Sequence, residues 1–296
     1  TQFAKPINEI TGVISQLQSA LAALERIFGL LGLEPEPDEA EKITVEPESI
    51  RGDIQFIHAS FSYIPEKPLI TDFSFHAKPG SMNAIVGPTG AGKTTLVNLL
   101  MRFYELNGGQ ILLDGTDIKD IKRESLRSCF AMVLQETWLF NGTIRENIAY
   151  GMPQASDEEI VQAAKAAYAH DFISRMPDGY NSIITEDGEN LSQGEKQLLT
   201  IARAMLLKPP MLILDEATSS VDTRTEQKIQ MAFKAAMKGR TSFVIAHRLS
   251  TIQDADVIIV MNKGDIVEYG SHDQLIKKKG FYYELYNSQF APAENS

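Results

Sequence analysis

Apolar residues recur every three or four positions between Ile10 and Leu31, which is the spacing of one face of a helix. The pattern predicts a helical extension over residues 1–33 that ends near Gly32. Its apolar face either packs on the domain that follows or continues a helix that begins upstream of the chain. Residues 34–50 are rich in Pro and Glu, a composition that is typical of a linker.

From residue 51 onward, short apolar runs alternate with longer amphipathic stretches. This order predicts an α/β domain with a largely parallel sheet. Strands are predicted around Ile54–Phe56 and Phe61–Tyr63, and at Leu69–Phe75, Ala84–Val86, Met211–Leu214, Ser242–Ala246 and Val257–Met261. Helices are predicted at Thr94–Tyr104, Asp157–Tyr168 and Gln193–Leu207, a hairpin turn at Asn262–Asp265, and a frayed end at 291–296.

The composition narrows the class of function. The 296 residues are 43% hydrophobic and 23% charged, and a net charge of −11 argues against a nucleic-acid partner. No apolar run approaches the ~20 residues of a membrane span, so we expect the chain as given to be soluble. Cys129 is the only cysteine, which excludes an internal disulfide and fits an inert thiol in a reducing compartment. A start at Thr1 rather than Met fits a piece of a longer polypeptide.

A glycine-rich segment joins the strand Ala84–Val86 to the following helix. It fits the phosphate-loop pattern G-x-x-x-x-G-K-[ST]. Its residues are Gly87, Pro88, Thr89, Gly90, Ala91, Gly92, Lys93, Thr94 and Thr95. Glycines let successive N–H groups point at one anion, and the helix start adds its positive end. We expect Lys93 to reach the β and γ phosphates and Thr94 to ligate Mg²⁺. The alternative is a tight turn without a ligand.

A carboxylate pair follows a second buried strand, Met211–Leu214. The carboxyl ends of strands in open α/β sheets are where ligands bind. Asp215 is therefore placed to hold Mg²⁺ through water, and Glu216 to polarise the water that attacks the γ phosphate. The alternative is that the pair merely caps a strand end. Together with the phosphate loop, the pair predicts binding and hydrolysis of ATP with Mg²⁺.

Two further side chains are candidates for the same site. His247 follows the strand Ser242–Ala246 and would face the γ phosphate if that strand is a parallel neighbour of the Asp215 strand, although a lone His is usually structural. Tyr63 precedes the phosphate loop and either stacks on the adenine ring or is a core tyrosine.

With four further motifs, these residues resemble the nucleotide-binding domain of ATP-binding cassette (ABC) transporters of the exporter type. Ser219–Asp222 is similar to the D-loop of that family, Gln135 to its Q-loop glutamine, and Glu186 to its X-loop. The signature-like segment consists of Leu191, Ser192, Gln193, Gly194 and Glu195, and it leads into a helix. The resemblance covers about residues 51–290 and keeps the order of the family's motifs.

The resemblance implies a P-loop NTPase (RecA-like) core, an antiparallel β subdomain and a helical subdomain at about 138–205. It also implies a head-to-tail dimer that sandwiches each ATP between the phosphate loop of one subunit and the signature of the other. Asp222 would then touch the nucleotide, and Gln135 would touch Mg²⁺ and the γ phosphate. The helical extension would continue the last transmembrane helix of a membrane domain, at the cytoplasmic face of the membrane.

The signature departs from the usual Leu-Ser-Gly-Gly-Gln, because Gln193 and Glu195 replace a glycine and the glutamine. Glu195 would place a negative charge near the partner's ATP, where like charges repel. This asymmetry predicts one half of a heterodimeric exporter, and a homodimer that tolerates Glu195 is the alternative. A soluble ABC-type ATPase, or a nucleotide switch with little hydrolysis, are rival functions.

Overall fold

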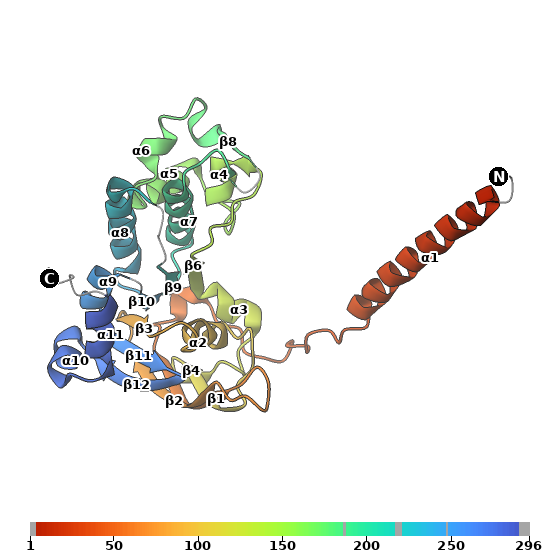
Figure 1. Cartoon of the computed structure of the whole chain (residues 1–296). Coiled ribbons are helices and arrows are strands. Elements are labelled where there is room, and N and C mark those ends of the chain that lie inside the picture. Colours follow the sequence, from red (N-terminus) through yellow and green to blue (C-terminus); the bar gives the residue numbers. More distant parts are fainter. Residues whose placement is uncertain (1–3, 186–187, 217–220, 247, 290–296) are drawn as a thin grey trace, which may run out of the picture. The chain divides into compact units, whose positions relative to one another are not determined.

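The computed structural model has two compact units, Thr1–Ala40 and Glu41–Ser296. It describes residues 4–185, 188–216, 221–246 and 248–289. The first unit contains helix α1 (Ala4–Leu31), drawn in red in Figure 1. The Gly32 N–H still donates to the Phe28 carbonyl at 2.9 Å, so the last turn closes on the glycine. Among the residues that the structure describes, no helix combines the length and apolar character that a membrane span needs.

A six-stranded sheet forms the centre of the second unit, in the order β12-β11-β3-β10-β9-β6. Its strands are β3 (Met82–Val86), β6 (Phe130–Val133), β9 (Met211–Asp215), β10 (Thr241–Ile245), β11 (Val257–Asn262) and β12 (Asp265–Gly270). All neighbours are parallel except the hairpin of β11 and β12. Because both faces are covered, β10 is buried along its whole length. The predicted, largely parallel α/β sheet is confirmed.

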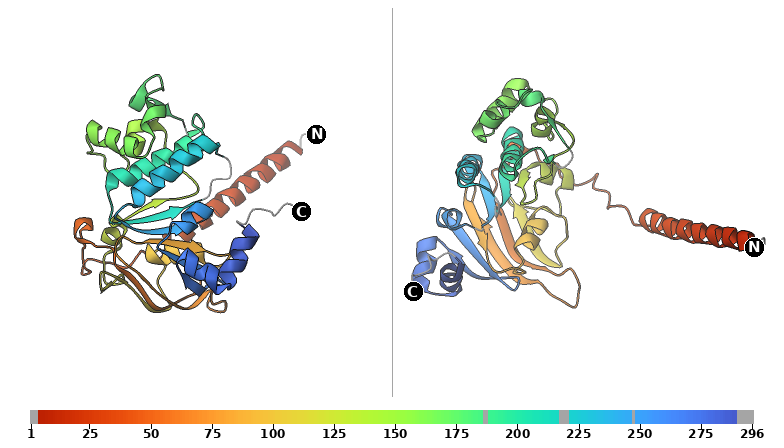
Figure 2. Two further views of the ribbon diagram at one scale, coloured as in Figure 1. Left: turned by 90° about the vertical axis from the view of Figure 1, so that its left-hand side faces the viewer. Right: turned by 45° about the horizontal axis from the view of Figure 1, so that its top comes forward.

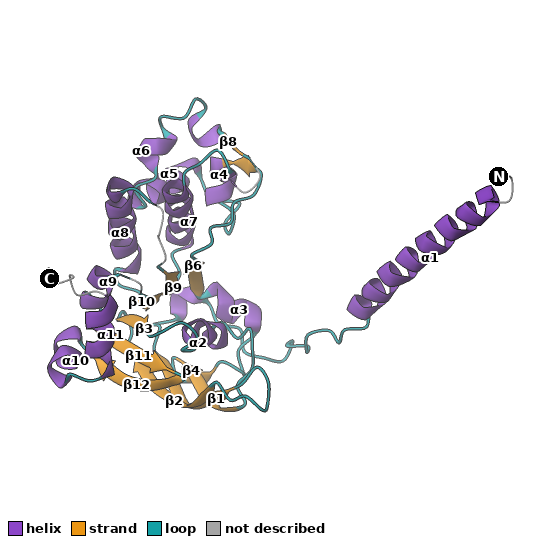
Figure 3. Cartoon of the chain, in the orientation of Figure 1, coloured by secondary structure: helices purple, strands orange, loops and turns teal. Residues whose placement is uncertain are grey.

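A second, antiparallel sheet lies on one side of the central sheet, in the order β2-β1-β4-β5. Its strands are β1 (Ile54–Phe61), β2 (Ile70–Ala77), β4 (Gly108–Leu113) and β5 (Thr116–Asp117). Helix α2 (Lys93–Leu100) shares one apolar core with both sheets, and Phe73, Leu96 and Phe243 belong to it. Figure 3 shows this layer of strands around α2.

The other face of the central sheet is covered by helices (Figure 2). The helices α7 (Gln193–Leu207) and α8 (Thr223–Met237) lie nearest that face. The helices α4 (Ile144–Ile148), α5 (Asp157–Ala166) and α6 (His170–Ile173) lie farther from the sheet, where α4 and α5 pack on α7 and α6 packs on α5. Leu198 of α7, Ile229 of α8 and Val244 of β10 belong to one core. The remaining elements are α3 (Arg123–Ser128), α9 (Leu249–Gln253), α10 (His272–Lys278), α11 (Phe281–Gln289), β7 (Gly142–Thr143), β8 (Ile183–Ile184) and the 3₁₀ turns Pro47–Ser49 and Gly179–Asn181.

The helix predicted at Thr94–Tyr104 is shorter than its sequence pattern. It ends at Leu100 because Arg102 has a left-handed backbone, with φ of 52°. The buried Arg102 guanidinium donates to the Ile121 carbonyl at 2.8 Å, which fixes the chain in this turn. Tertiary contact therefore overrides helical spacing here.

Candidate nucleotide site

The phosphate loop begins with a close approach of two backbones. A Cβ added at Gly87 would lie 2.2 Å from the Met261 carbonyl oxygen on β11, so only glycine fits between β3 and its neighbour. Further along, Gly92 has φ of 97° and precedes α2 without any side-chain cap. The first N–H groups of α2 are therefore left for another acceptor, which is the arrangement that suits an anion.

Lys93 folds back over this loop. Its Nζ donates to the Gly87 carbonyl at 2.7 Å and to the Pro88 carbonyl at 3.0 Å. Burial lowers the pKa of the Lys93 ammonium, and the nearby negative charge of Asp215 opposes that shift. A phosphate beside this partly desolvated ammonium would supply the negative charge that neutral carbonyls lack. The residues present therefore fit a bound triphosphate.

A pocket of ≈ 460 Å³ lies in front of the loop. Its lining consists of Leu69, Thr89, Gly90, Ala91, Gly92, Lys93, Thr94, Thr95, Gln135, Asp215 and Ile245. The side chains of Thr94, Gln135 and Asp215 bring a hydroxyl, an amide and a carboxylate to one cavity. Oxygen ligands of this kind are the ones that Mg²⁺ prefers. No cluster of three or more His, Cys, Asp or Glu in the described ranges could hold a metal by itself, so phosphate oxygens or water would have to complete the coordination.

Tyr63 lies at the edge of the same region. Its hydroxyl is 3.2 Å from Thr95 Oγ1, and its ring meets the rings of Phe61 and Tyr104 edge-on. The side chain is 48% exposed, which does not fit the alternative of a core tyrosine and leaves an aromatic face available for stacking.

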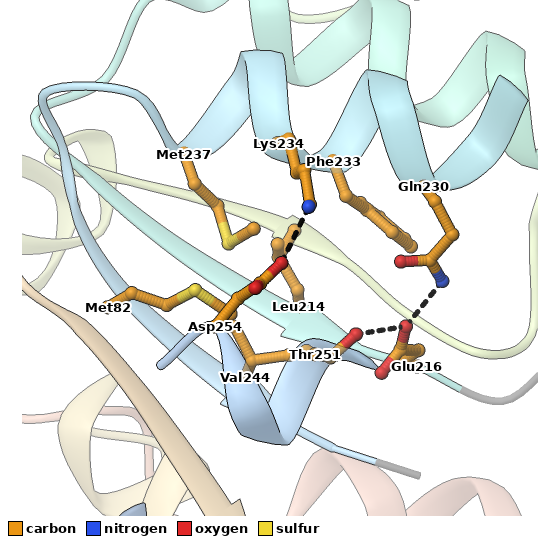
Figure 4. A pocket seen from close by; sticks show the side chains of 10 residues that line it. All are labelled: Met82, Leu214, Glu216, Gln230, Phe233, Lys234, Met237, Val244, Thr251 and Asp254. Carbon is orange, nitrogen blue, oxygen red and sulfur yellow. Dashed lines mark hydrogen bonds and ion pairs between the residues drawn. The ribbon is translucent and has the colours of Figure 1, made fainter. Parts of the chain in front are cut away.

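Glu216 is not brought to this pocket. Asp215 lines the phosphate-loop pocket, whereas the Glu216 side chain is 1% exposed and lines a small cavity on the helical side of the sheet. Figure 4 shows Glu216 Oε1 accepting hydrogen bonds from Gln230 and Thr251, each 2.7 Å long. Arg248 Nε lies 3.7 Å from the same oxygen.

Some of the predicted residues lie outside the described ranges. These are His247, the D-loop residues Ser219 and Ser220, and Glu186. The D-loop aspartate is described: Asp222 Oδ1 accepts from the N–H groups of Arg224 and Thr225 and so caps α8. The hydrogen bonds from Thr225 hold the pKa of the Asp222 carboxyl below its usual value.

The signature-like segment forms the start of α7 and lines no part of the phosphate-loop pocket. Ser192 and Glu195 make a capping box, because the Glu195 N–H donates to Ser192 Oγ while Glu195 Oε2 accepts from the Ser192 N–H at 2.9 Å and its hydroxyl at 2.7 Å. Leu191 is buried, and Gln193 is exposed. A Cβ at Gly194 would lie 2.3 Å from Thr225 Cγ2, so this glycine allows α7 to pack closely on α8.

Sequence reasoning missed several residues that fix the helical layer and the Glu216 side chain. Arg203 on α7 donates to the carbonyls of Trp138 and Asn147, and also to the Asn147 side chain at 2.7 Å. Burial lowers the pKa of Arg203 to about 10. Gln230 and Thr251 were also missed, since they are polar residues on ordinary amphipathic helices. A polar side chain on the buried face of such a helix was the available signal.

The family model described as "ABC transporter" matches residues 70–219. The chain is 54% identical over 284 residues to a fatty acid ABC transporter ATP-binding/permease protein of Mycobacterium tuberculosis (strain CDC 1551 / Oshkosh), covering 96% of this chain and 44% of that protein. It is 49% identical over 289 residues to an ATP-dependent lipid A-core flippase of Acinetobacter baylyi, covering 97% and 50%. The solved structure of a bacterial Atm1-family ABC exporter with ATP bound matches with a TM-score of 0.83 at 40% identity, covering 100% of this chain and 51% of that chain.

A glycine-rich loop between a buried parallel strand and an uncapped helix defines a P-loop nucleotide-binding domain. With the family match over residues 70–219 and a relative that is 54% identical, the chain belongs to the ABC transporter family. The predicted family and fold class are confirmed. The chain spans about half the length of the curated relatives it matches.

Proposed function

We propose that this chain drives the export of a substrate across a membrane by binding and hydrolysing ATP. The observation that carries this proposal is the single pocket that joins Lys93 and the open start of α2 to Asp215, Gln135 and Thr94. A cation, helix amides and oxygen ligands are the groups that hold a magnesium-bound triphosphate.

Each residue of the pocket has a proposed role. The amides from Gly90 to Thr95 and the Lys93 ammonium hold the β and γ phosphates. Thr94, Asp215 and Gln135 would hold Mg²⁺, directly or through water. The ion supplies charge neutralisation at the phosphate oxygens. Gly87, Pro88 and Thr89 shape the loop, and Tyr63 would stack on the adenine.

Hydrolysis needs a group that orients water on the γ phosphate, and we assign this role to Glu216 with His247. Phosphoryl transfer requires mainly positioning and electrostatic stabilisation, so one well-placed carboxylate is enough to direct the water. Glu216 lies beside Asp215 in sequence, and a change of its side-chain conformation would have to bring its carboxylate to the pocket.

A second nucleotide-binding domain is the proposed partner, placed head to tail. The signature helix start of that second domain would cover the ATP held by this chain, and residues 191–195 with Asp222 would serve the ATP of the partner. Glu195 already occupies the start of α7 with a carboxylate, which supports a weakened second site and hence a heterodimer.

The substrate and the membrane partner are proposed from the relatives. The proteins named as a fatty acid transporter and a lipid A-core flippase share this domain, and one of them is named as a fused ATP-binding/permease protein. We infer that the substrate is a lipid-like amphiphile, and that a transmembrane domain holds this chain at the cytoplasmic face of a membrane.

The test is ATP turnover by Glu216→Gln in the presence of Mg²⁺. The amide keeps the shape of the side chain but cannot act as a carboxylate, so we expect turnover to fall roughly 100-fold or more while ATP affinity stays within about threefold. Turnover would be measured by phosphate release and affinity by calorimetry. Undiminished turnover in a folded variant would contradict the role of Glu216.

A further inference from the structure

The Glu216 carboxylate is fixed by two helices that flank the central sheet. Gln230 comes from α8 and Thr251 from α9, and both donate to the same oxygen, Glu216 Oε1, over 2.7 Å (Figure 4). Hydrogen bonds to a charged acceptor are about twice as strong as neutral ones. Arg248 adds its charge at 3.7 Å and pairs with Glu226 at 3.1 Å. The carboxylate is thus held by groups from outside the phosphate loop.

The cavity around this carboxylate cannot receive a nucleotide. Its volume is ≈ 20 Å³, and its lining includes Phe233 and Met237 beside Glu216. A space of that size holds about one water molecule. The reacting phosphate therefore cannot come to Glu216, so Glu216 has to move to the phosphate.

Successive side chains of an extended chain point to opposite faces, which explains why Asp215 and Glu216 separate. Asp215 ends β9, paired with Ile245 of β10, and faces the phosphate-loop pocket. The Glu216 N–H donates to the Ile245 carbonyl at 3.1 Å, so its backbone stays with the sheet. Movement of the carboxylate is a matter of side-chain rotation and of the two helices that hold it.

We propose that Gln230 and Thr251 are positioning residues that hold Glu216 in a withdrawn state, and that hydrolysis requires the carboxylate to leave them. This inference rests on the proposed role of Glu216 in hydrolysis. Before each turnover the carboxylate gives up two hydrogen bonds, so these donors lower the fraction of molecules that are competent for hydrolysis. ATP binding uses the other side of β9 and is independent of them.

Gln230 and Arg248 also line an open groove of ≈ 850 Å³ between α8 and α9. Two of the residues that contact the Glu216 carboxylate are therefore accessible from the surface. Asp222 caps the start of α8, the helix that carries Gln230, so a displacement of that helix would alter the hold directly. One of the two donors, Gln230, thus lies on a helix that begins at the D-loop residue Asp222, whereas Thr251 lies on α9.

The test compares Thr251→Val and Gln230→Leu with the unaltered chain. Each variant removes one donor at nearly constant volume, so we expect kcat for ATP hydrolysis to rise, by roughly tenfold at most, which is the shift expected from one charge-assisted hydrogen bond. KM for ATP should stay within about twofold, because the binding pocket is untouched. A merely structural role would lower kcat or leave it unchanged.

Two matched controls distinguish the loss of a hydrogen bond to Glu216 from other effects of altering this cavity. Thr251→Ser keeps the hydroxyl and should restore the original kcat. Lys234→Gln alters the same cavity without touching Glu216, since Lys234 pairs with Asp254 at 2.6 Å, and should leave kcat unchanged. In a Glu216→Gln background, Gln230→Leu should have no effect on the residual rate.

An unchanged or lower kcat in Thr251→Val and Gln230→Leu would overturn the inference. If Thr251→Val does not purify folded, the half-buried Gln230 provides the decision through Gln230→Leu alone. A Glu216→Gln variant that keeps full turnover would instead remove the proposed function of Glu216, so the two failures give different results.

Discussion

Helices α2 and α7 both begin at a position where an anion could bind, but only α7 has a side-chain cap. Gly92 precedes α2 with no side-chain cap, whereas Ser192 precedes α7 with a complete capping box to Glu195. Both helix starts carry a partial positive charge and N–H groups that have no acceptor within the helix itself. At α2 these groups are open to an external anion, whereas at α7 the Glu195 N–H donates to Ser192 Oγ and the Glu195 carboxylate accepts from the Ser192 N–H and hydroxyl.

For the proposed head-to-tail dimer, this difference indicates which of the two phosphate-binding elements is already open in the isolated chain. The phosphate-loop half needs only the nucleotide, because the Lys93 ammonium and the α2 amides face a formed pocket. At the signature-like segment, the Ser192 hydroxyl already donates to Glu195 Oε2 at 2.7 Å, so it would have to leave this acceptor before it could bind a phosphate. A phosphate that takes the Ser192 hydroxyl as donor would replace that hydrogen bond to Glu195.

The largest expected effect comes from Lys93→Ala. Among the residues that the structure describes, Lys93 is the one cation in the lining of the phosphate-loop pocket, so we expect its removal to lower ATP affinity roughly 100-fold, about 3 kcal/mol. Calorimetry with MgATP measures the change. Lys165→Ala, at an exposed position of α5, is the matched control and should bind ATP normally. Unchanged ATP affinity in a folded Lys93→Ala variant would contradict the proposal that the start of α2 binds the phosphates.

An intermediate effect is expected from Gly87→Ala. The new Cβ would lie 2.2 Å from the Met261 carbonyl oxygen, so the loop must shift away from β11. We expect a loss of about 2 kcal/mol in the free energy of unfolding and roughly tenfold weaker ATP binding. Gly115→Ala has open space around it and carries only the cost of a positive φ of 89°. Equal unfolding midpoints for the two variants would contradict the steric explanation.

The smallest expected effect comes from Glu195→Gln, which tests the occupied state of α7. The amide oxygen can still accept from Ser192, so stability should change by less than about 0.5 kcal/mol. The lost negative charge should strengthen ATP-dependent association of nucleotide-binding domains about threefold. Sedimentation in MgATP, in a Glu216→Gln background, measures it. The matched control is Glu159→Gln, which makes the same substitution in the separate capping box of α5 and should not change association. Weaker association of Glu195→Gln would reverse the interpretation.

The sequence allowed the parallel sheet and the phosphate loop to be predicted because both are local patterns. Strand Ala84–Val86, the glycines and Lys93 are consecutive in the chain, and their chemistry does not depend on distant residues. The end of α2 was placed too late, because Arg102 is fixed by the carbonyl of Ile121, which no local pattern reveals.

The position of Glu216 was the least predictable part of the site. Its place after Asp215 was read correctly as a strand end, but its direction depends on Gln230 and Thr251, which are 14 and 35 residues away in sequence. Cys129 was easier: it is buried, its Sγ donates to the Ser125 carbonyl, and burial raises the pKa of its thiol to about 11. An inert thiol follows from those surroundings.

Arg203 has a mechanical consequence for the helix that starts at Ser192. Its guanidinium joins that helix to the Trp138 and Asn147 carbonyls, in the stretch that follows Gln135. A movement of α7 would therefore also move the segment that contains Trp138 and Asn147, as long as these hydrogen bonds remain. The chain segment after Gln135, which lines the phosphate-loop pocket, and helix α7 are thereby connected through the guanidinium of Arg203.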